Sequence, residues 1–551
     1  MKLFPTVLSV AVSLLIGSRL QTGPARTIEP EHPALGNEAC AACHSEIYKS
    51  YLATAMARAS GSALKGFVPG EFDDQTSGVR YRVYKRDSQV WMSYQRGTEL
   101  SGRREFLYFI GSGKKGRTYL FSDQGFLFES PINWYSQENR WNMTPAYTQS
   151  REIPMNLPAL SSCLNCHTSG MQPHIPGTAN RFAEKPFLHD GITCERCHGG
   201  GEVHLDGKGA ITNPAKLPAE RRDEICMECH FEGTAAVEQP GKRLYQFQPG
   251  DRLSDYVHYF VLNDNQKQAA EALSQFEALS LSACKRKSGE RMWCGSCHDP
   301  HREPQEAEKP AYYRGKCLRC HTDKFASKHH PDKPDCIGCH MPELPSTDVA
   351  HTQSTDHRIL RYRAILAPPS RPSLQKTRLE PFPSHTNSLV TTRDLALAWE
   401  TLAQRGVAGA GREGEEFLRK ALKETPDDPR LLSSYAFVEQ QHGKNKEARD
   451  LYERAVQLQP RANTAETNLG ILAARSGDLQ HAVLLWQQAF QRVPYRSAIG
   501  MDLAIAFCAA SQKDDARHYV ERVLEFNPDY AVARQMMAHL DNDPSECKPK
   551  K

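Results

Sequence analysis

Residues 191–204 read GITCERCHGGGEVH and contain the pattern that decides the fold of this chain. In this stretch Cys194 and Cys197 are separated by two residues, and His198 follows at once. The same CxxCH pattern occurs seven times among the 551 residues and takes up fourteen of the seventeen cysteines. Zinc sites and disulfides also use paired cysteines, but neither requires a histidine in the next position. The repetition therefore indicates one chemistry shared by all seven motifs.

CxxCH is the signature of covalent c-type haem attachment. Two thiols at this spacing form thioethers with one porphyrin, and the next imidazole binds the iron as its proximal ligand. The sequence therefore predicts seven covalently attached haem c groups. The attachment sites are Cys40, Cys43, Cys163, Cys166, Cys194, Cys197, Cys226, Cys229, Cys294, Cys297, Cys317, Cys320, Cys336 and Cys339. The proximal ligands are His44, His167, His198, His230, His298, His321 and His340.

A six-coordinate iron needs a second axial ligand, and residues 21–360 contain ten histidines outside the motifs. His301 follows His298 by three residues, which span at most about 10 Å. This is too short to pass around a porphyrin, so we expect His301 to ligate a different haem, and the same holds for His204. The distal candidates rank as His204, His301, His351 and His357 first, then His329 or His330, then His189, His174 and His258.

For the weaker distal candidates, a surface or hydrogen-bonded imidazole is an equally good interpretation, and it is the favoured one for His32. No histidine follows His44 closely, but Met56 lies twelve residues beyond it. Methionine ligates some c-type haems, although a core role is commoner for this residue type. A haem without a distal ligand would be open to a substrate.

The composition is consistent with haems as interior material. Only 39% of the residues are hydrophobic and the mean hydropathy is −0.60, yet 17 Cys, 20 Tyr and 21 Phe exclude a disordered chain. Six motifs lie between residues 163 and 340, which leaves about 30 residues per haem, too few for separate globules. We therefore expect closely packed haems. The net charge of +4 does not indicate nucleic-acid binding.

Residues 1–20 are expected to be a secretory signal, because one Lys precedes an apolar run that is too short to cross a bilayer. No later window is apolar enough for a membrane span, so no span is expected in the mature chain. The predicted location is extracytoplasmic, in the periplasm or its equivalent.

Residues 45–162 contain no haem motif, and a small antiparallel β insertion is predicted at about 66–155. Residues 111–118 read GSGKKGRT and nearly satisfy a phosphate-binding loop. The next residues, TYLF, are β-prone, whereas that loop needs a helix, so a Gly-rich hairpin is the better interpretation. Trp134, Tyr135 and Trp141 are expected to pack against a porphyrin.

The C-terminal third has a period of 34 residues, shown by Pro426, Pro460, Pro494 and Pro528. Small residues recur at the positions of Ala436, Gly470 and Ala504, and large residues at those of Tyr452, Trp486 and Val520. This is the pattern of tetratricopeptide repeats, which usually bind proteins or peptides. The expected organisation is a haem domain at 30–360, a Pro-rich linker at 361–392, repeats at 393–540 and a tail at 541–551.

The stretches GITCERCHGGGEVH, WCGSCHDPH, PDCIGCHMP and TDHRI resemble the multihaem cytochrome c superfamily. This superfamily includes pentahaem nitrite reductases, octahaem hydroxylamine oxidoreductases and tetrahaem electron carriers. The chain is most similar to periplasmic multihaem cytochromes with C-terminal tetratricopeptide repeats. The resemblance implies close-stacked, mostly bis-His haems. The nitrite reductases use a CxxCK haem, which is absent here, and no Tyr matches the cross-link of the hydroxylamine enzymes.

The predicted fold class is mainly α: a multihaem cytochrome domain with sparse secondary structure and a small β insertion, followed by an α-solenoid. The favoured function is electron transfer along the haems, with a redox protein partner at the haem surface and a protein or peptide partner at the repeats. The alternative is an oxidoreductase that acts on a small nitrogen or sulfur oxyanion at one open haem. No catalytic residue can be named from the sequence.

Overall fold

The computed structural model describes residues 35–263, 274–322, 335–344, 354–361, 378–386 and 389–542. The predicted signal at 1–20 and most of the predicted tail at 541–551 lie outside these ranges, as do His32, His329, His330 and His351. No helix in the described ranges is long and apolar enough to cross a membrane.

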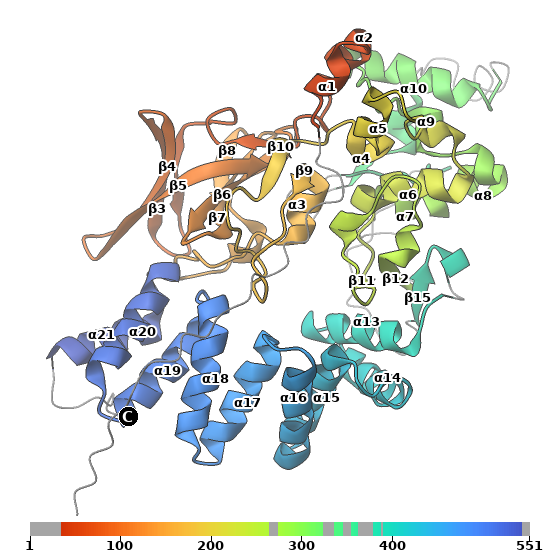
Figure 1. Ribbon diagram of the computed structural model, residues 1–551. Coiled ribbons are helices and arrows are strands. Elements are labelled where there is room, and N and C mark those ends of the chain that lie inside the picture. Colours follow the sequence, from red (N-terminus) through yellow and green to blue (C-terminus); the bar gives the residue numbers. More distant parts are fainter. Residues whose placement is uncertain are drawn as a thin grey trace, which may run out of the picture. The chain divides into compact units, whose positions relative to one another are not determined.

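Residues 60–143 form an eight-stranded antiparallel sheet (Figure 1). The strands are β1 Ser60–Ser62, β2 Gly70–Asp74, β3 Val79–Arg86, β4 Gln89–Arg96, β5 Leu100–Ile110, β6 Gly116–Asp123, β7 Phe126–Tyr135 and β8 Arg140–Met143. Strands β2 to β8 pair in chain order, and β1 pairs with β5. The two end strands also approach each other, because a Cβ added to Gly70 of β2 would lie 2.6 Å from Cδ1 of Trp141 in β8. The sheet is thus nearly closed into a barrel.

This sheet corrects the predicted fold class, because the N-terminal part is not sparse in secondary structure. Alternation builds the sheet: in β3, Val79, Tyr81 and Val83 are buried while the residues between them are exposed.

The prediction that Trp141 packs against a porphyrin is wrong. Its ring lies 5.2 Å from that of Tyr119, in the core of the sheet. The Gly-rich hairpin is confirmed, since residues 111–115 join β5 to β6.

The CxxCH motifs lie on short helices, of which the first precedes the eight-stranded sheet in the chain and the others follow it. These are α1 Glu38–Ala41, α3 Ser161–His167, α4 Glu195–His198, α6 Ala219–His230, α9 Cys294–Cys297, α10 Lys309–Leu318 and α12 Cys336–His340. Other short helices are α2 Ser45–Leu52, α5 Gly201–Leu205, α7 Gln275–Leu281 and α8 Ala283–Ser288. Three small sheets accompany them: β9 Thr168–Met171 with β10 Phe187–Asp190, β11 Ala235–Glu238 with β12 Val257–Asn263 and β15 Arg378–Phe382, and β13 Glu343–Leu344 with β14 Ser354–Thr355.

Strand β15 lies inside the range expected to be a linker. It pairs with β12, so that this part of residues 361–392 is ordered against the haem domain rather than extended between domains. The side chain of Leu379 contributes to the same hydrophobic cluster as Phe260 and Leu397.

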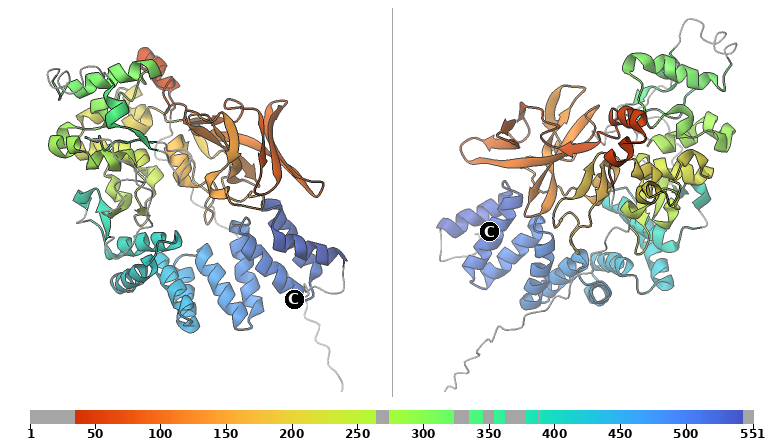
Figure 2. Two further views of the ribbon diagram at one scale, coloured as in Figure 1. Left: turned by 180° about the vertical axis from the view of Figure 1, so that it is seen from behind. Right: turned by 45° about the horizontal axis from the view of Figure 1, so that its top comes forward.

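The C-terminal part consists of paired helices that follow one another in chain order (Figure 2). They are α13 Thr392–Gln404, α14 Ala410–Glu424, α15 Pro429–Gln441, α16 Asn445–Leu458, α17 Asn463–Arg475, α18 Leu479–Arg492, α19 Ser497–Ala509, α20 Lys513–Phe526 and α21 Ala531–Asn542. Helices α15, α17 and α19 begin 34 residues apart, and each periodic proline comes two residues after the second helix of a pair. The predicted helical repeats are confirmed.

The repeat positions pack as their residue sizes predict. Ala436, Tyr452 and Ala504 are completely buried. At Gly470, an added Cβ would lie 2.4 Å from Nε1 of Trp486, so only glycine lets these two helices approach. Small residues on the first helix therefore accommodate the large residue of the second.

The repeats also contact the rest of the chain through specific side chains. Arg96 of β4 forms a bidentate ion pair with Asp529, at 2.5 and 2.7 Å. Phe128 of β7 packs on Tyr495 and Phe526, with ring centres 5.4 and 5.6 Å apart. The core of the sheet is therefore continuous with the core of the last repeats.

Candidate functional site

Each CxxCH motif forms a single helical turn that brings both thiols and the imidazole together. In the motif of Cys194, the backbone N–H of His198 donates to the carbonyl of Cys194 at 3.0 Å. The corresponding bonds from His44, His298 and His321 measure 2.9–3.0 Å. None of the fourteen motif cysteines forms a disulfide. The thiols are therefore available as a pair beside each histidine.

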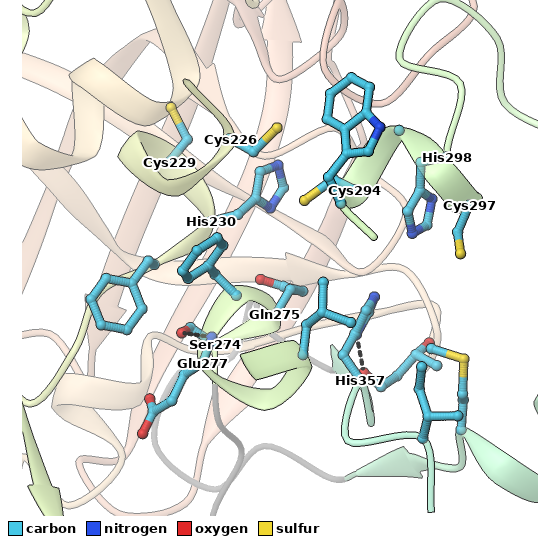
Figure 3. Close-up of a pocket in the computed structure, with 18 of the residues that line it drawn as sticks. Cys226, Cys229, His230, Ser274, Gln275, Glu277, Cys294, Cys297, His298 and His357 are labelled. Atoms are coloured by element: carbon cyan, nitrogen blue, oxygen red, sulfur yellow. Dashed lines mark hydrogen bonds between the residues drawn. The ribbon is translucent and has the colours of Figure 1, made fainter. Parts of the chain in front are cut away.

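Most of the motifs open into one cavity of about 3380 Å³. Its lining includes Cys197 and the complete motifs that end in His167, His230, His298, His321 and His340. Pockets for a single small molecule measure about 300–1,000 Å³, so this volume suits several large ligands side by side. Figure 3 shows two of these motifs in the cavity, with the imidazole of His230 near Cys226, that of His298 near Cys297, and His357 approaching from a separate segment below them.

Thiols of different motifs are close enough to affect one another's pKa, because the fold packs several CxxCH segments together. Burial and the thiol of Cys40 raise the pKa of Cys194 to about 12. The same kind of interaction joins further pairs, namely Cys166 with Cys229, Cys226 with Cys294 and Cys317 with Cys336. Close packing of the motifs is thus a property of the fold.

The imidazoles of His198, His340 and His357 are held in the tautomer that a metal requires. Nδ1 of His198 donates to the carbonyl of Thr212 at 2.8 Å, and Nδ1 of His340 donates to that of Leu360 at 2.6 Å. A proton on Nδ1 leaves the lone pair on Nε2 for a metal. His357 is oriented in the same way by the carbonyl of Thr355, at 2.7 Å.

Burial also keeps several imidazoles of the site neutral. It lowers the pKa of His167, His198, His230 and His357. The pKa of His298 falls to about 4, because burial and the neighbouring His357 and His230 disfavour the imidazolium. Neutral imidazoles, paired thiols and a cavity of sufficient size fit the predicted haem groups.

Two distal candidates lie next to a proximal histidine of another motif. The ring centre of His301 is 5.8 Å from that of His198, with 16° between the ring planes. The ring centre of His357 is 6.1 Å from that of His298, at 30°. Two imidazoles on opposite sides of one metal, with bonds of about 2.0 Å, have ring centres about 6 Å apart. Both pairs match this separation.

Other candidates are placed differently. His204 is exposed on α5 and has no ring contact with another histidine in the described part of the chain. Met56 lines the cavity. His189 lies beside Gly36, where an added Cβ would be 2.8 Å from its Cε1. His174 is half-buried.

His258 has a structural role. It is 5% exposed, and its Nδ1 donates to Oδ2 of Asp394 at 2.9 Å. Asp394 belongs to the first turn of α13, so this bond attaches the repeats to β12. His258 is therefore a hydrogen-bonded imidazole, which was the alternative to a distal ligand for the weaker candidates.

Some site residues could not have been found from the motifs alone. Tyr313 places its hydroxyl 3.3 Å from Nδ1 of His298. Asn165, Arg196 and Glu228 lie between the cysteines of three motifs, and they form a buried cluster. The only sequence signal for this cluster is a polar residue at the same position of these three motifs.

Known families match the haem-binding part. The family described as cytochrome c554 and c-prime matches residues 134–199. The family described as a doubled CXXCH motif matches residues 286–326. No curated protein matches the chain. Together with the motif geometry, these matches confirm the resemblance to multihaem c-type cytochromes, a class of electron-transfer proteins that bind haem c covalently.

The solved structures described next are each similar to about a quarter of the chain. MamA from Desulfovibrio magneticus RS-1 is 14% identical, covering 28% of this chain and 89% of that one, with a TM-score of 0.25. PilF of Pseudomonas aeruginosa is 22% identical over 27% and 67% of the two chains, with a TM-score of 0.24. YrrB, described as a TPR protein with an unusual peptide-binding site, is 17% identical over 26% and 73%, at 0.23. With such low TM-scores, the tetratricopeptide assignment rests on the paired helices themselves.

Proposed function

We propose that the protein is an exported c-type cytochrome that carries seven haems and transfers electrons between them. The observation that carries the proposal is the single cavity shared by five complete motifs and by Cys197 of a sixth. Bound haem c supplies one-electron chemistry between ferric and ferrous iron. The chain's own residues attach the porphyrins, orient the imidazoles and hold neighbouring motifs in contact.

We further propose two axial pairs. His301 is the distal partner of His198, and His357 is the distal partner of His298. Each pair joins residues that are far apart in sequence, so each haem would fasten one motif to a segment beyond it. The expectation that His301 serves a haem other than its neighbour His298 is supported by the 5.8 Å separation of the His198 and His301 rings.

The repeats are proposed to bind a protein partner. Phe437 of α15 and Ile505 of α19 occupy the same repeat position, two repeats apart, and are 49% and 54% exposed. Exposed apolar residues in register along a solenoid are typical of a protein-binding surface. The redox partner is proposed to dock on the haem-binding part.

A second candidate function is an oxidoreductase for a small nitrogen or sulfur oxyanion. It is supported by cationic side chains in the cavity lining, which include Lys287, Arg291, Arg314, Lys316, Arg319 and Arg361. The same cations suit haem propionates, so they do not distinguish the two functions by themselves.

Haem count and spin state test the proposal. The protein is produced in a host that exports it and matures c-type cytochromes, and its mass and pyridine haemochrome spectrum are recorded. Seven haem additions, absence of residues 1–20 and low-spin electron paramagnetic resonance signals are expected. A mass without haem would refute the proposal. A strong high-spin signal that changes on addition of nitrite or sulfite would favour the oxidoreductase.

A further inference from the structure

A buried cluster joins three CxxCH motifs through the residues between their cysteines. Asn165, Arg196 and Glu228 each occupy the second intervening position, in CLNCH, CERCH and CMECH. Asn165 and Glu228 are each 3% exposed, and the side chain of Arg196 is 15% exposed. One cluster thus connects the second, third and fourth motifs.

Every member of the cluster contacts the other two. Nη2 of Arg196 donates to Oε1 of Glu228 at 2.6 Å and to Oδ1 of Asn165 at 3.2 Å. It also donates to the carbonyl of Asn165 at 3.1 Å. The amide of Asn165 completes the cluster by donating to Oε1 of Glu228 at 3.1 Å.

The cluster lies among the haem-attachment cysteines. Arg196 and Glu228 line the shared cavity together with the neighbouring thiols of Cys166, Cys197 and Cys229. In addition, Nε of Arg196 is buried without a hydrogen-bond partner in the described structure. The guanidinium therefore has a donor left over in a cavity proposed to hold carboxylate-bearing porphyrins.

A buried ion pair at this place is not explained by stability. Removing two charges from water is costly, and apolar residues of similar volume often stabilise a core equally well. The same motif position is Ala42, Ser296 or Gly338 in three other motifs, and Arg319, which is exposed, in the sixth motif. A haem motif as such does not require charge here.

We propose that Asn165, Arg196 and Glu228 are positioning residues that hold three haem-attachment segments in one geometry and set the reduction potentials of their haems. The inference rests on the proposed haem binding. Ferric iron carries one more positive charge than ferrous iron. A nearby guanidinium therefore favours the reduced state and a nearby carboxylate favours the oxidised state, and buried charges act more strongly because the local dielectric constant is low.

The test compares charge-removing variants of the full-length holoprotein by spectroelectrochemical titration. Arg196→Gln is expected to lower the potentials of the haems nearest the cluster, and Glu228→Gln is expected to raise them. Arg196→Lys keeps the charge and should leave the potentials close to those of the wild type. Arg319→Gln, which removes the same charge at the exposed position of the sixth motif, is the matched control and should shift the potentials less.

The outcomes separate this inference from the proposed function. Protein without haem would refute haem binding itself. Fully loaded protein in which both single variants shift in the same direction, or shift no more than Arg319→Gln, would overturn the inference. If a single variant fails to load haem, the double variant Arg196→Gln/Glu228→Gln, which removes both charges of the pair, is measured in its place. Recovery of haem loading in the double variant supports the ion pair. If the double variant does not load haem while Arg196→Lys loads normally, polar contacts other than the charge pair hold the three segments.

Discussion

The histidines of this protein show how a backbone carbonyl prepares a side chain for a metal. At His198 and His340 a backbone carbonyl accepts a hydrogen bond from Nδ1, so the ring lone pair is on Nε2, and burial keeps the imidazole of His198 neutral. Neither partner, Thr212 nor Leu360, belongs to a motif. The motif itself supplies the thiols and the imidazole. The orientation of the imidazole is set by a residue from elsewhere in the chain.

The proposed axial pair of His198 and His301 can be tested at this scale. His301→Ala is expected to leave the haem count unchanged and to convert one iron from low spin to high spin, because an iron with one imidazole has a weaker ligand field. His204→Ala is the control. His204 is exposed and has no ring contact with another described histidine, so its variant should keep the wild-type electron paramagnetic resonance spectrum. Equal spectra for both variants would contradict the pairing.

Asp394 gives a prediction with a defined pH dependence. Burial raises its pKa, but hydrogen bonds from His258 and Thr391 outweigh burial and bring the pKa below the usual 3.8. A lowered pKa in the folded state means that the carboxylate stabilises the protein above about pH 4, and that this contribution is lost as the pH falls through the folded value.

Asp394→Asn should therefore lower the free energy of unfolding by about 1–3 kcal/mol at pH 7, and the difference from wild type should shrink below about pH 4. Urea unfolding followed by helical circular dichroism measures both. Asp427→Asn is the control, because the pair of Asp427 with Arg454 is exposed and such pairs contribute about 0–1 kcal/mol. A pH-independent difference for Asp394→Asn would contradict the assignment.

At the scale of elements, the repeats depend on close approach of two helices. Gly470 of α17 faces Trp486 of α18, whose Nε1 donates to the carbonyl of Thr467 at 3.1 Å and so cannot easily move. Small residues at this position are therefore a packing requirement.

Gly470→Ala should lower the free energy of unfolding by about 1–3 kcal/mol, because the new methyl group overpacks this contact. Gly411→Ala on α14 is the matched control. No atom lies within 4 Å of its added Cβ, so alanine there should be neutral or stabilise by up to about 1 kcal/mol. Thermal unfolding compares the two, and a neutral Gly470→Ala would show that α17 and α18 pack less tightly than described.

At the scale of the whole molecule, the repeats are not a free appendage. Helix α13 is attached to β12 through Asp394 and His258, and the last repeats share a core with the eight-stranded sheet. Part of the solenoid surface is therefore used within the chain, and the proposed partner must bind the exposed remainder, which includes Phe437 and Ile505.

Haem loading should change the charge of the whole protein. Each haem adds two propionates and, when ferric and bis-His ligated, about one positive charge, so seven haems shift the net charge of the full sequence from +4 to about −3, and loss of Lys2 and Arg19 with residues 1–20 makes it about −5. Isoelectric focusing should place the holoprotein clearly below the sequence pI of 8.2. A loaded protein that still focuses near 8 would contradict either the count or the ionisation of the propionates.

The sequence by itself determined the features whose chemistry is local in the chain. CxxCH places two thiols and an imidazole on one helical turn, and the 34-residue period places small and large residues on facing helices, so both were predicted correctly. A small antiparallel β insertion at about 66–155 was predicted, but the near closure of its sheet was not, because closure depends on the contact of Gly70 with Trp141.

Only the tertiary structure decided which motifs meet and which spare histidines face them. His301 and His357 lie beside imidazoles that are distant in sequence, whereas His204 lies beside no other imidazole of the described residues and His258 binds Asp394 instead. The physical reason is that a single imidazole looks the same in sequence whether it binds a carboxylate, a metal or water. Its role depends on the groups that long-range packing places within about 3 Å of its nitrogens.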